Sequence, residues 1–201
     1  MVEDSSISWV ADTEYPISTA LVKSQLRLIE SDFDALIDNL HLPAAVQWAE
    51  SVMRRSILTK VHTWTIRAFP VDIPRIRLPR GKCSKVESIV YIDGKVPITL
   101  KGATSTIPGT AYQEDLGNDS GGLLMPPQGG SWPFADIDAM KPIVITFSAG
   151  WAKASVPADI QMALAQYVSD ALFVTGQADV KDSGWLSAKE LLLSNWTLRG
   201  F

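Results

Sequence analysis

Residues 157–172 read PADIQMALAQYVSDAL, and this stretch decides half of the fold. Apolar residues recur in it every three or four positions, which is the spacing of one face of an α-helix. The face consists of Ile160, Ala163, Leu164, Tyr167, Val168, Ala171 and Leu172. Pro157 suits the first helical position, because a backbone N–H there would have no partner within the helix. The stretch therefore predicts a long amphipathic helix that must bury one face.

A second helical pattern lies closer to the N-terminus. Ser18 is placed to cap a short helix, and Ser31 with Asp34 resembles a capping box that opens a longer one. The apolar face expected for the longer helix consists of Phe33, Leu36, Ile37, Leu40, Ala44, Trp48 and Val52. Pro43 falls inside this pattern. Since proline removes a helical hydrogen bond and clashes with the preceding turn, we expect a kink or a break near Leu42.

The pattern between these helical regions is that of a β-sheet. Short runs rich in β-branched and aromatic residues predict strands at 61–69, 73–78, 86–92, 98–101 and 143–147. Asp93-Gly94 separates two of them and is a strong signal for a two-residue hairpin. Residues 102–140 are rich in Gly, Pro, Ser and Thr, so we expect a long loop that becomes ordered at a contact with a partner.

These patterns predict an α+β fold. The N- and C-terminal segments, 1–57 and 155–201, are expected to form one helical bundle, with a last short helix at 187–193. Residues 58–154 are expected to form an antiparallel, β-rich insertion that includes the long Gly/Pro-rich loop.

Composition limits the classes of function. The chain has 201 residues, 46% of them hydrophobic, and can therefore bury a real core. A single cysteine, Cys83, cannot form an internal disulfide, and neither a signal peptide nor a membrane-spanning run of apolar residues is evident, which favours the cytoplasm. The net charge of −4 argues against wrapping a nucleic acid. A modest basic cluster, expected to be a solvated strand edge, consists of Arg75, Arg77, Arg80, Lys82 and Lys85.

One short motif imitates a catalytic site. Residues 119–122 read Asp-Ser-Gly-Gly, the setting of the nucleophile in trypsin-like proteases. Such a serine needs a histidine base that is oriented by a buried aspartate. His41 lies on an expected helix and His62 in an expected strand, so a polar, glycine-rich turn explains the motif better. A serine hydrolase built on Ser120 remains the alternative from outside the structural classes.

The acidic residues give no metal site. Asp32, Asp34 and Asp38 lack the glycine and the distant glutamate of a calcium loop, and acids near a helix start complement the helix dipole. No phosphate loop or zinc motif occurs either. We therefore expect no cofactor and no metal.

The C-terminal segment 195–201, NWTLRGF, is unusually apolar for the end of a sequence. Large apolar side chains need a cover, because water penalises each of them by about 1.5 to 3 kcal/mol. Two interpretations remain open: the segment folds back on its own helices, or it anchors in another subunit.

Several landmarks in order resemble one family. Tyr15 to Ser18, Leu26 to Leu28 and Ser31 to Ile37 resemble the opening of the head–tail connector (adaptor) proteins of tailed bacteriophages. Further landmarks that look like those of the family are at 64–70, 76–80, 86–93, 112, 115, 132–133, 145–151, 156–157 and 191–193. The chain departs from the family pattern at 53–56, where the family commonly has Thr-Gly-Arg, and at 195–196, where a proline is common.

The resemblance implies a structural, non-enzymatic adaptor in the virion neck, made in the host cytoplasm. Such subunits form a homo-oligomeric ring, expected here to be a dodecamer, beneath the portal protein. The ring extends the DNA channel and docks the stopper or tail-completion protein, while packaged DNA passes without sequence-specific binding and no membrane is involved. A stopper or tail-completion subunit of the same neck is the alternative structural role.

The resemblance and the residues together suggest two contact sites. We expect Trp196, Leu198, Arg199 and Phe201 to bind the portal, as the C-terminal tail of such adaptors typically does. Trp132, Pro133 and Phe134 are expected to contact a neighbouring subunit or the tail, because an aromatic pair in a Gly/Pro-rich loop needs an anchor to bury.

Overall fold

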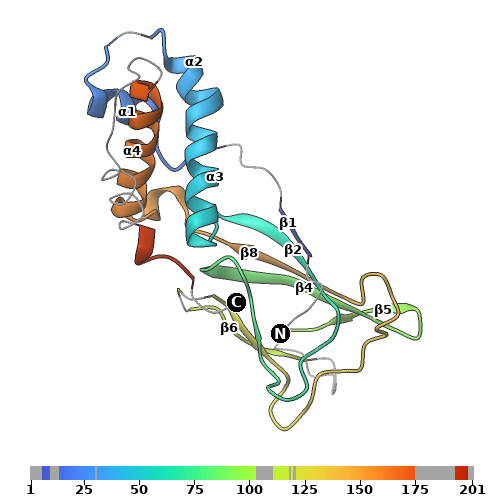
Figure 1. Ribbon diagram of the computed structural model, residues 1–201. Helices are drawn as coiled ribbons and strands as arrows, with labels where there is room; N and C mark the ends of the chain where they lie inside the picture. Colours follow the sequence, from blue (N-terminus) through green and yellow to red (C-terminus); the bar gives the residue numbers. More distant parts are fainter. Residues whose placement is uncertain are drawn as a thin grey trace. The chain divides into compact units, whose positions relative to one another are not determined.

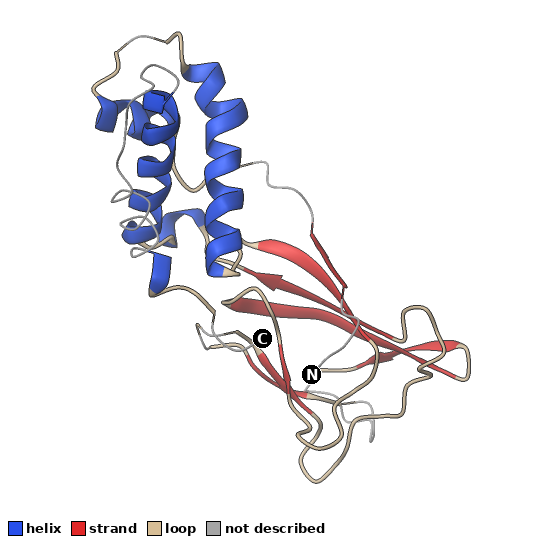
Figure 2. Ribbon diagram, in the orientation of Figure 1, coloured by secondary structure: helices blue, strands red, loops and turns tan. Residues whose placement is uncertain are grey.

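The computed structural model describes residues 6–9, 14–29, 31–102, 111–117, 119, 121–174 and 193–198. The chain divides into two compact units. Met1–Ala11 and Thr59–Gly150 make the first, here called the sheet unit, and Asp12–Leu58 and Trp151–Phe201 make the second, the helical unit. Figures 1 and 2 show strands in the one and helices in the other. The α+β mixture expected from the sequence is confirmed.

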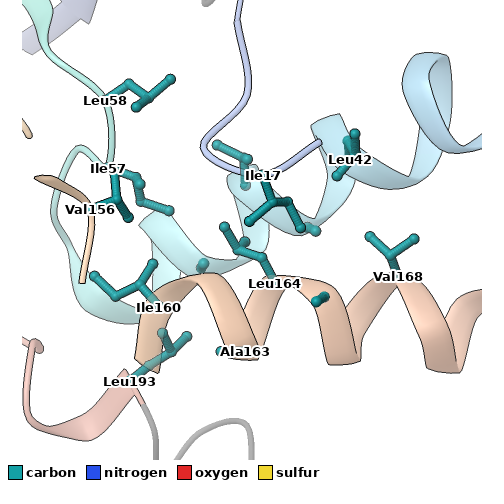
Figure 3. Close-up of a cluster of buried hydrophobic side chains, with 14 of the residues drawn as sticks. Ile17, Leu42, Ile57, Leu58, Val156, Ile160, Ala163, Leu164, Val168 and Leu193 are labelled. Carbon is teal, nitrogen blue, oxygen red and sulfur yellow. The ribbon is translucent and has the colours of Figure 1, made fainter. Parts of the chain in front are cut away.

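The helical unit is built around one apolar core. Its elements are α1 (Thr19–Leu26), α2 (Asp34–Leu36), the π-helical turn η1 (Ile37–His41), α3 (Leu42–Met53), the short 3-10 helix η2 (Lys153–Ser155) and α4 (Ala158–Val174). Side chains of α4 and α3 meet Ile17, Ile57 and Leu193 in this core (Figure 3). Trp48 of α3 stacks on Tyr167 of α4, with ring centroids 5.0 Å apart.

The predicted stripe of α4 is buried. Ile160, Ala163, Leu164 and Val168 are enclosed in the core. Ser18 caps α1 as expected, since its side chain accepts a hydrogen bond from the Leu21 N–H at 3.2 Å. The predicted capping box at Ser31 is wrong: the residue before α2 is Phe33, and no side chain caps this helix. The expected last helix, 187–193, falls outside the described residues except for Leu193, which is helical together with Ser194.

Pro43 does not break its helix, but the regular α-helical pattern is interrupted just before Leu42, where the sequence predicts a kink or a break. The backbone stays helical from Asp34 to Met53, and the turn before the proline is π-helical, with the Leu42 N–H bonded to the Ile37 carbonyl. A π-turn spaces its hydrogen bonds five residues apart instead of four, so it takes up one extra residue. The wider turn accommodates a proline that has no N–H to donate.

The π-turn also shifts the centre of the buried face. Ile37 is fully buried as expected, and Trp48 and Val52 pack against the core but are only partly buried. The buried residues of α3 are Leu42, Ala45, Val46, Ala49 and Met53. Phe33, Leu36 and Leu40, expected in the core, are exposed. The extra residue explains both departures, because it rotates α3 relative to the turn that precedes it.

The sheet unit contains two antiparallel sheets. The larger has the order β1-β2-β8-β4-β5, from β1 (Ser6–Trp9), β2 (Lys60–Ile66), β8 (Ile143–Ala149), β4 (Cys83–Asp93) and β5 (Val96–Leu100). The smaller has the order β3-β7-β6, from β3 (Ile76–Arg77), β7 (Leu123–Met125) and β6 (Gln113–Asp115). Gly94 and Lys95, which join β4 to β5, both have positive φ, as the primed turn of the predicted hairpin requires.

Two sequence-based boundaries are wrong in this unit. The sequence assigns residues 1–57 to the helical part, yet Ser6–Trp9 pair with β2 at the edge of the larger sheet. The sequence predicts one loop over 102–140, yet β6 and β7 lie within it, and β7 pairs with both β6 and β3. Runs of three polar or apolar residues are too short for a periodic signal, so the sequence pattern could not show them.

Candidate assembly interface

Residues 193–198 fold back onto the helical unit. The Leu198 N–H donates to the Met53 carbonyl at the end of α3 (3.0 Å), and the Trp196 indole N–H donates to Asp159 of α4 (3.4 Å). Leu193 and Leu198 are buried, and Trp196 is partly buried. We call residues 193–198, together with Arg55 and Trp151, the C-terminal clamp.

Arg55 and Trp151 hold the middle of the clamp. The Arg55 guanidinium donates to the Trp196 carbonyl and lies over the Trp151 ring, 6.0 Å from its centroid. The Trp151 and Trp196 rings meet edge to face, with centroids 5.6 Å apart. A buried arginine that satisfies a carbonyl and stacks on an aromatic ring is well suited to fix a chain segment.

The backbone conformation after α3 explains how Arg55 reaches the C-terminal clamp. Arg54 adopts a left-handed conformation (φ 56°) and ends α3, so the chain turns sharply after it. Glu50 then accepts a hydrogen bond from the Ile57 N–H at 2.9 Å, and the Ile57 carbonyl accepts one from Trp151. The segment 53–56, where the sequence departs from the adaptor pattern, thus holds the clamp.

The structure decides between the two interpretations of the C-terminal segment for the residues that it describes. Trp196 and Leu198 fold back on their own helices, as the first interpretation supposed. Arg199 and Phe201 lie outside the described residues. Binding of these four residues to a portal stays a prediction.

The second predicted contact site is divided between core and surface. Trp132 is buried in the sheet unit, where it stacks on Phe69 at 4.9 Å and donates its indole N–H to the Pro74 carbonyl at 2.9 Å. Pro133 is half-buried, and Phe134 is exposed. Trp132 therefore anchors this loop to its own chain, and of the three predicted contact residues Phe134 is the one exposed large apolar side chain.

The Asp-Ser-Gly-Gly segment has a conformational explanation. Ser120 lies outside the described residues, but Gly121 has a φ of +116°, and a Cβ atom built on it would sit 2.7 Å from the Leu78 carbonyl oxygen. The Gly122 carbonyl accepts a hydrogen bond from the Leu78 N–H. The glycines are needed for this close approach of two backbones, which supports the interpretation of the motif as a turn.

Replacing Gly121 by Ala should lower the free energy of unfolding by roughly 2 to 4 kcal/mol, because strained backbone and overpacking each cost about 1 to 3 kcal/mol. Urea denaturation measures this change. Gly129→Ala is the matched control, since Gly129 also has a positive φ but open space around it. Equal effects at the two positions would contradict the steric explanation.

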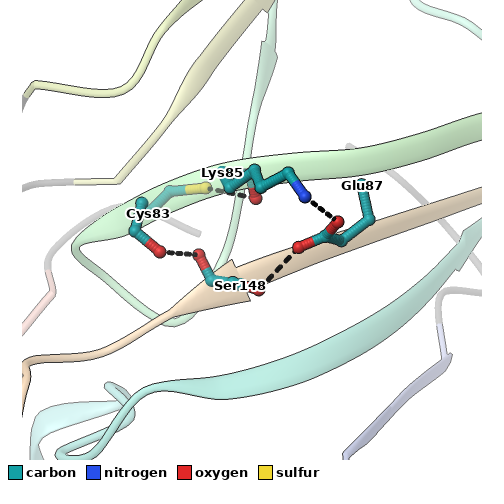
Figure 4. Close-up of polar contacts among 5 residues, drawn as sticks. Cys83, Lys85, Glu87 and Ser148 are labelled. Atoms are coloured by element: carbon teal, nitrogen blue, oxygen red, sulfur yellow. Dashed lines mark hydrogen bonds and ion pairs between the residues drawn. The ribbon is translucent and has the colours of Figure 1, made fainter.

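A polar group on β4 and β8 does not form a catalytic set. Glu87 accepts hydrogen bonds from Lys85 (2.5 Å) and from the Ser148 hydroxyl (3.1 Å), as Figure 4 shows. These bonds lower the pKa of Glu87. His62 pairs with Phe147 across the strands, so the alternation of side chains puts it on the opposite sheet face from Ser148. His62 therefore cannot act as a base for the Ser148 hydroxyl.

Cys83 is not an activated thiol. It is buried, and burial raises the pKa of its thiol to about 11, so it stays protonated at neutral pH. Within the described part of the chain, no three His, Cys, Asp or Glu side chains are placed to hold a metal ion, and no helix is long and apolar enough to cross a membrane.

His62 should make folding stability depend on pH. Burial, with Arg80 and Lys60 adding to it, lowers the pKa of His62 from 6.5 to about 4. Between these values the unfolded chain binds a proton that the folded chain does not, so stability falls as the pH drops from about 6.5 to 4, by at most about 1.4 kcal/mol per pH unit. Urea denaturation of the native protein and of His62→Gln at pH 7, 6 and 5 should show the smaller slope in the variant. Parallel slopes would rule out this role for His62.

Comparison with solved structures gives a full-length match. One chain in the neck of an empty gene transfer agent (GTA) particle, computed with C6 symmetry, superposes with a TM-score of 0.71 over 98% of this chain and 97% of its own, at 16% sequence identity. A chain in the neck of the native particle, computed with C12 symmetry, gives 0.65 at 15% identity and the same coverage. A chain in the virion of the native particle gives 0.66 at 17% identity, with 97% of each chain covered.

The chain has the fold of a particle-neck protein. The likeness in fold to these neck and virion chains extends over nearly the whole length of the sequence. No protein-family model matches the sequence, and no curated protein matches it significantly. The likeness in fold is thus evident from structure at an identity where family models and curated sequences give no match.

Proposed function

We propose that the protein is a structural head–tail adaptor subunit in the neck of a tailed phage-like particle. The observation that carries this proposal is the likeness to chains of a particle neck and virion over 97–98% of the sequence. A likeness of this extent includes both the helical and the sheet units, so it is not that of one common motif. The adaptor landmarks of the sequence support the same role.

In this proposal, copies of the chain form a ring beneath the portal, extend the DNA channel and dock the stopper or tail-completion protein. The C12 and C6 symmetries of the similar necks support a cyclic assembly, and we propose a dodecamer. The net charge of −4 is suited to a conduit, because a strongly basic lumen would retain the DNA that must slide through it.

The role requires no reaction, and we propose that the protein is not an enzyme. The buried, protonated Cys83 thiol and the separation of His62 from Ser148 support this view within the described residues. The helical unit, with α1, α3 and α4 packed around one core, is proposed to be the bundle that carries the ring.

The portal contact is proposed to begin where the clamp ends. Trp196 and Leu198 are fixed to the helical unit and hold the root of the segment. Arg199 and Phe201, which follow, are proposed to reach the portal, with Arg199 pairing to a carboxylate or carbonyl and Phe201 filling an apolar cleft. Repetition around a ring multiplies a modest affinity of each copy.

The test is binding to purified portal rings of the same particle. Light scattering and electron microscopy should show a ring of the chain on the portal, and Arg199→Glu with Phe201→Ala should weaken binding at least tenfold. Lys141→Glu, at an exposed lysine of the sheet unit, is the control of equal charge change. Failure of the native chain to form a ring or to bind the portal would refute the proposal, and binding only to an assembled adaptor would assign it to the stopper.

A further inference from the structure

An apolar stripe on the helical unit lies outside its core. Phe33 immediately precedes α2, Leu36 ends it and Leu40 lies in η1, so the three residues follow one another along the start of one continuous helical segment. Their exposed fractions are 42%, 37% and 55%. We call these three residues the helical stripe. Large apolar side chains gathered on one surface are unfavourable in water and commonly mark a contact surface.

The helical stripe is surrounded by negative charge. Residues 31–41 contain three aspartates and no lysine or arginine. Asp32 and Asp38 are exposed beside the stripe, while Asp34 is paired with Lys23 at 2.7 Å. A partner for this surface should therefore combine apolar groups with positive charge.

The sheet unit presents a surface of that kind. Val71, Ile73 and Phe134 are 90%, 57% and 83% exposed, and the hydrogen bond from Trp132 to the Pro74 carbonyl joins the two loops that carry them. We call these three residues the loop patch. Arg75 follows on the same loop and Arg77 on β3, and both are exposed, as is Asp72 between Val71 and Ile73. The loop patch thus matches the helical stripe in apolar character, and residues 71–77 carry two arginines against one aspartate, whereas residues 31–41 carry three aspartates and no lysine or arginine.

Two different, complementary surfaces are what a closed ring requires. In a cyclic assembly with more than two copies, each copy uses one surface toward its neighbour on one side and another toward the neighbour on the other side. We propose that the helical stripe of one copy docks on the loop patch of the next copy. This inference rests on the ring proposed above and names the surfaces that close it.

Disulfide trapping tests the pairing directly. Leu40→Cys and Ile73→Cys are made as separate proteins with different tags, and the buried Cys83 is left in place as an unreactive thiol. Under oxidation, each protein alone should stay monomeric on a non-reducing gel, whereas the mixture should give a covalent dimer containing both tags. Self-linking of either variant alone, or no dimer in the mixture at concentrations where the native chain forms rings, would overturn the proposal.

Charge reversal gives a second, independent test. Asp32→Lys and Arg75→Glu should each weaken ring formation about tenfold, and the two together in one chain should restore it, because opposite charges again face each other between copies. Leu36→Glu with Leu40→Glu should abolish rings. Met162→Glu is the matched control, since Met162 is also a half-exposed apolar residue of the helical unit, on α4. Circular dichroism confirms that each variant is folded.

These outcomes separate the inference from the proposed function. If the native chain forms rings and binds the portal while the stripe and patch variants do so equally well, the helical stripe faces another protein and the inference fails alone. If the native chain forms no ring, alone or on the portal, the proposed function fails and the inference fails with it.

Discussion

Deleting residues 195–201 should lower the free energy of unfolding by about 4 to 7 kcal/mol, because truncating a buried leucine costs about 2 to 5 kcal/mol and removing a half-buried tryptophan adds about 2 kcal/mol. Leu198 is buried, and Trp196 packs against Trp151 at the clamp. The loss also leaves Arg55 buried without the Trp196 carbonyl, which adds to the cost. Urea denaturation followed by tryptophan fluorescence and circular dichroism measures the effect.

Asn195→Ala is the control for this deletion, since Asn195 is an exposed residue of the same segment. It should leave the unfolding midpoint within the error of the native value. An unchanged midpoint in the deletion variant would mean that the clamp is not part of the folded core. It would also restore the view that the whole segment is free to enter a portal.

Replacing Phe147 by Ala should destabilise the protein by about 3 to 5 kcal/mol, as truncation of a buried aromatic ring does. Phe147 is fully buried on β8, the middle strand of the larger sheet, and stacks on His62 with ring centroids 5.4 Å apart. A ring of this size leaves a cavity that two hydrogen-bonded neighbouring strands cannot fill. The thermal midpoint and the urea midpoint should both fall.

Val144→Ala on the same strand is the control, because Val144 is only half-buried. It should cost about 1 kcal/mol or less. A loss of equal size in the two variants would show that the core of the sheet unit is not centred on Phe147.

The sequence predicts which segments form helices and strands better than it predicts which side of each helix is buried. The stripe of α4 and the hairpin near Asp93-Gly94 follow from periods and turn chemistry that are local, and both are confirmed, although the two turn residues are Gly94 and Lys95, one position later than predicted. The π-turn cannot be predicted from such local sequence patterns. Its extra residue changes which side of α3 is buried, and nothing in the spacing of Phe33, Leu36 and Leu40 shows that these residues turn away from the core.

In the two predicted contact sites, the sequence likewise shows that apolar residues are present but not what covers them. Apolar side chains at 196 and 198 indicate that something covers them, but the cover is formed by Arg55, Trp151 and Asp159, which are distant in sequence. Likewise, Trp132 and Phe134 are near neighbours of similar character, yet one is a core residue and the other is exposed. Only the tertiary fold distinguishes an anchor within the chain from a contact between chains.

The π-turn at Ile37–His41 separates the side-chain directions of the residues before it from those of α3. A relative that lacked a single residue in this turn would carry a regular helix, and the surface before the turn would rotate by about 100° relative to α3. Alignments of neck proteins should therefore place a one-residue gap here, and sequences on the two sides of the gap should present different surfaces at corresponding positions. A single insertion or deletion could in this way redirect a neighbour contact while the buried face of α3 stays unchanged.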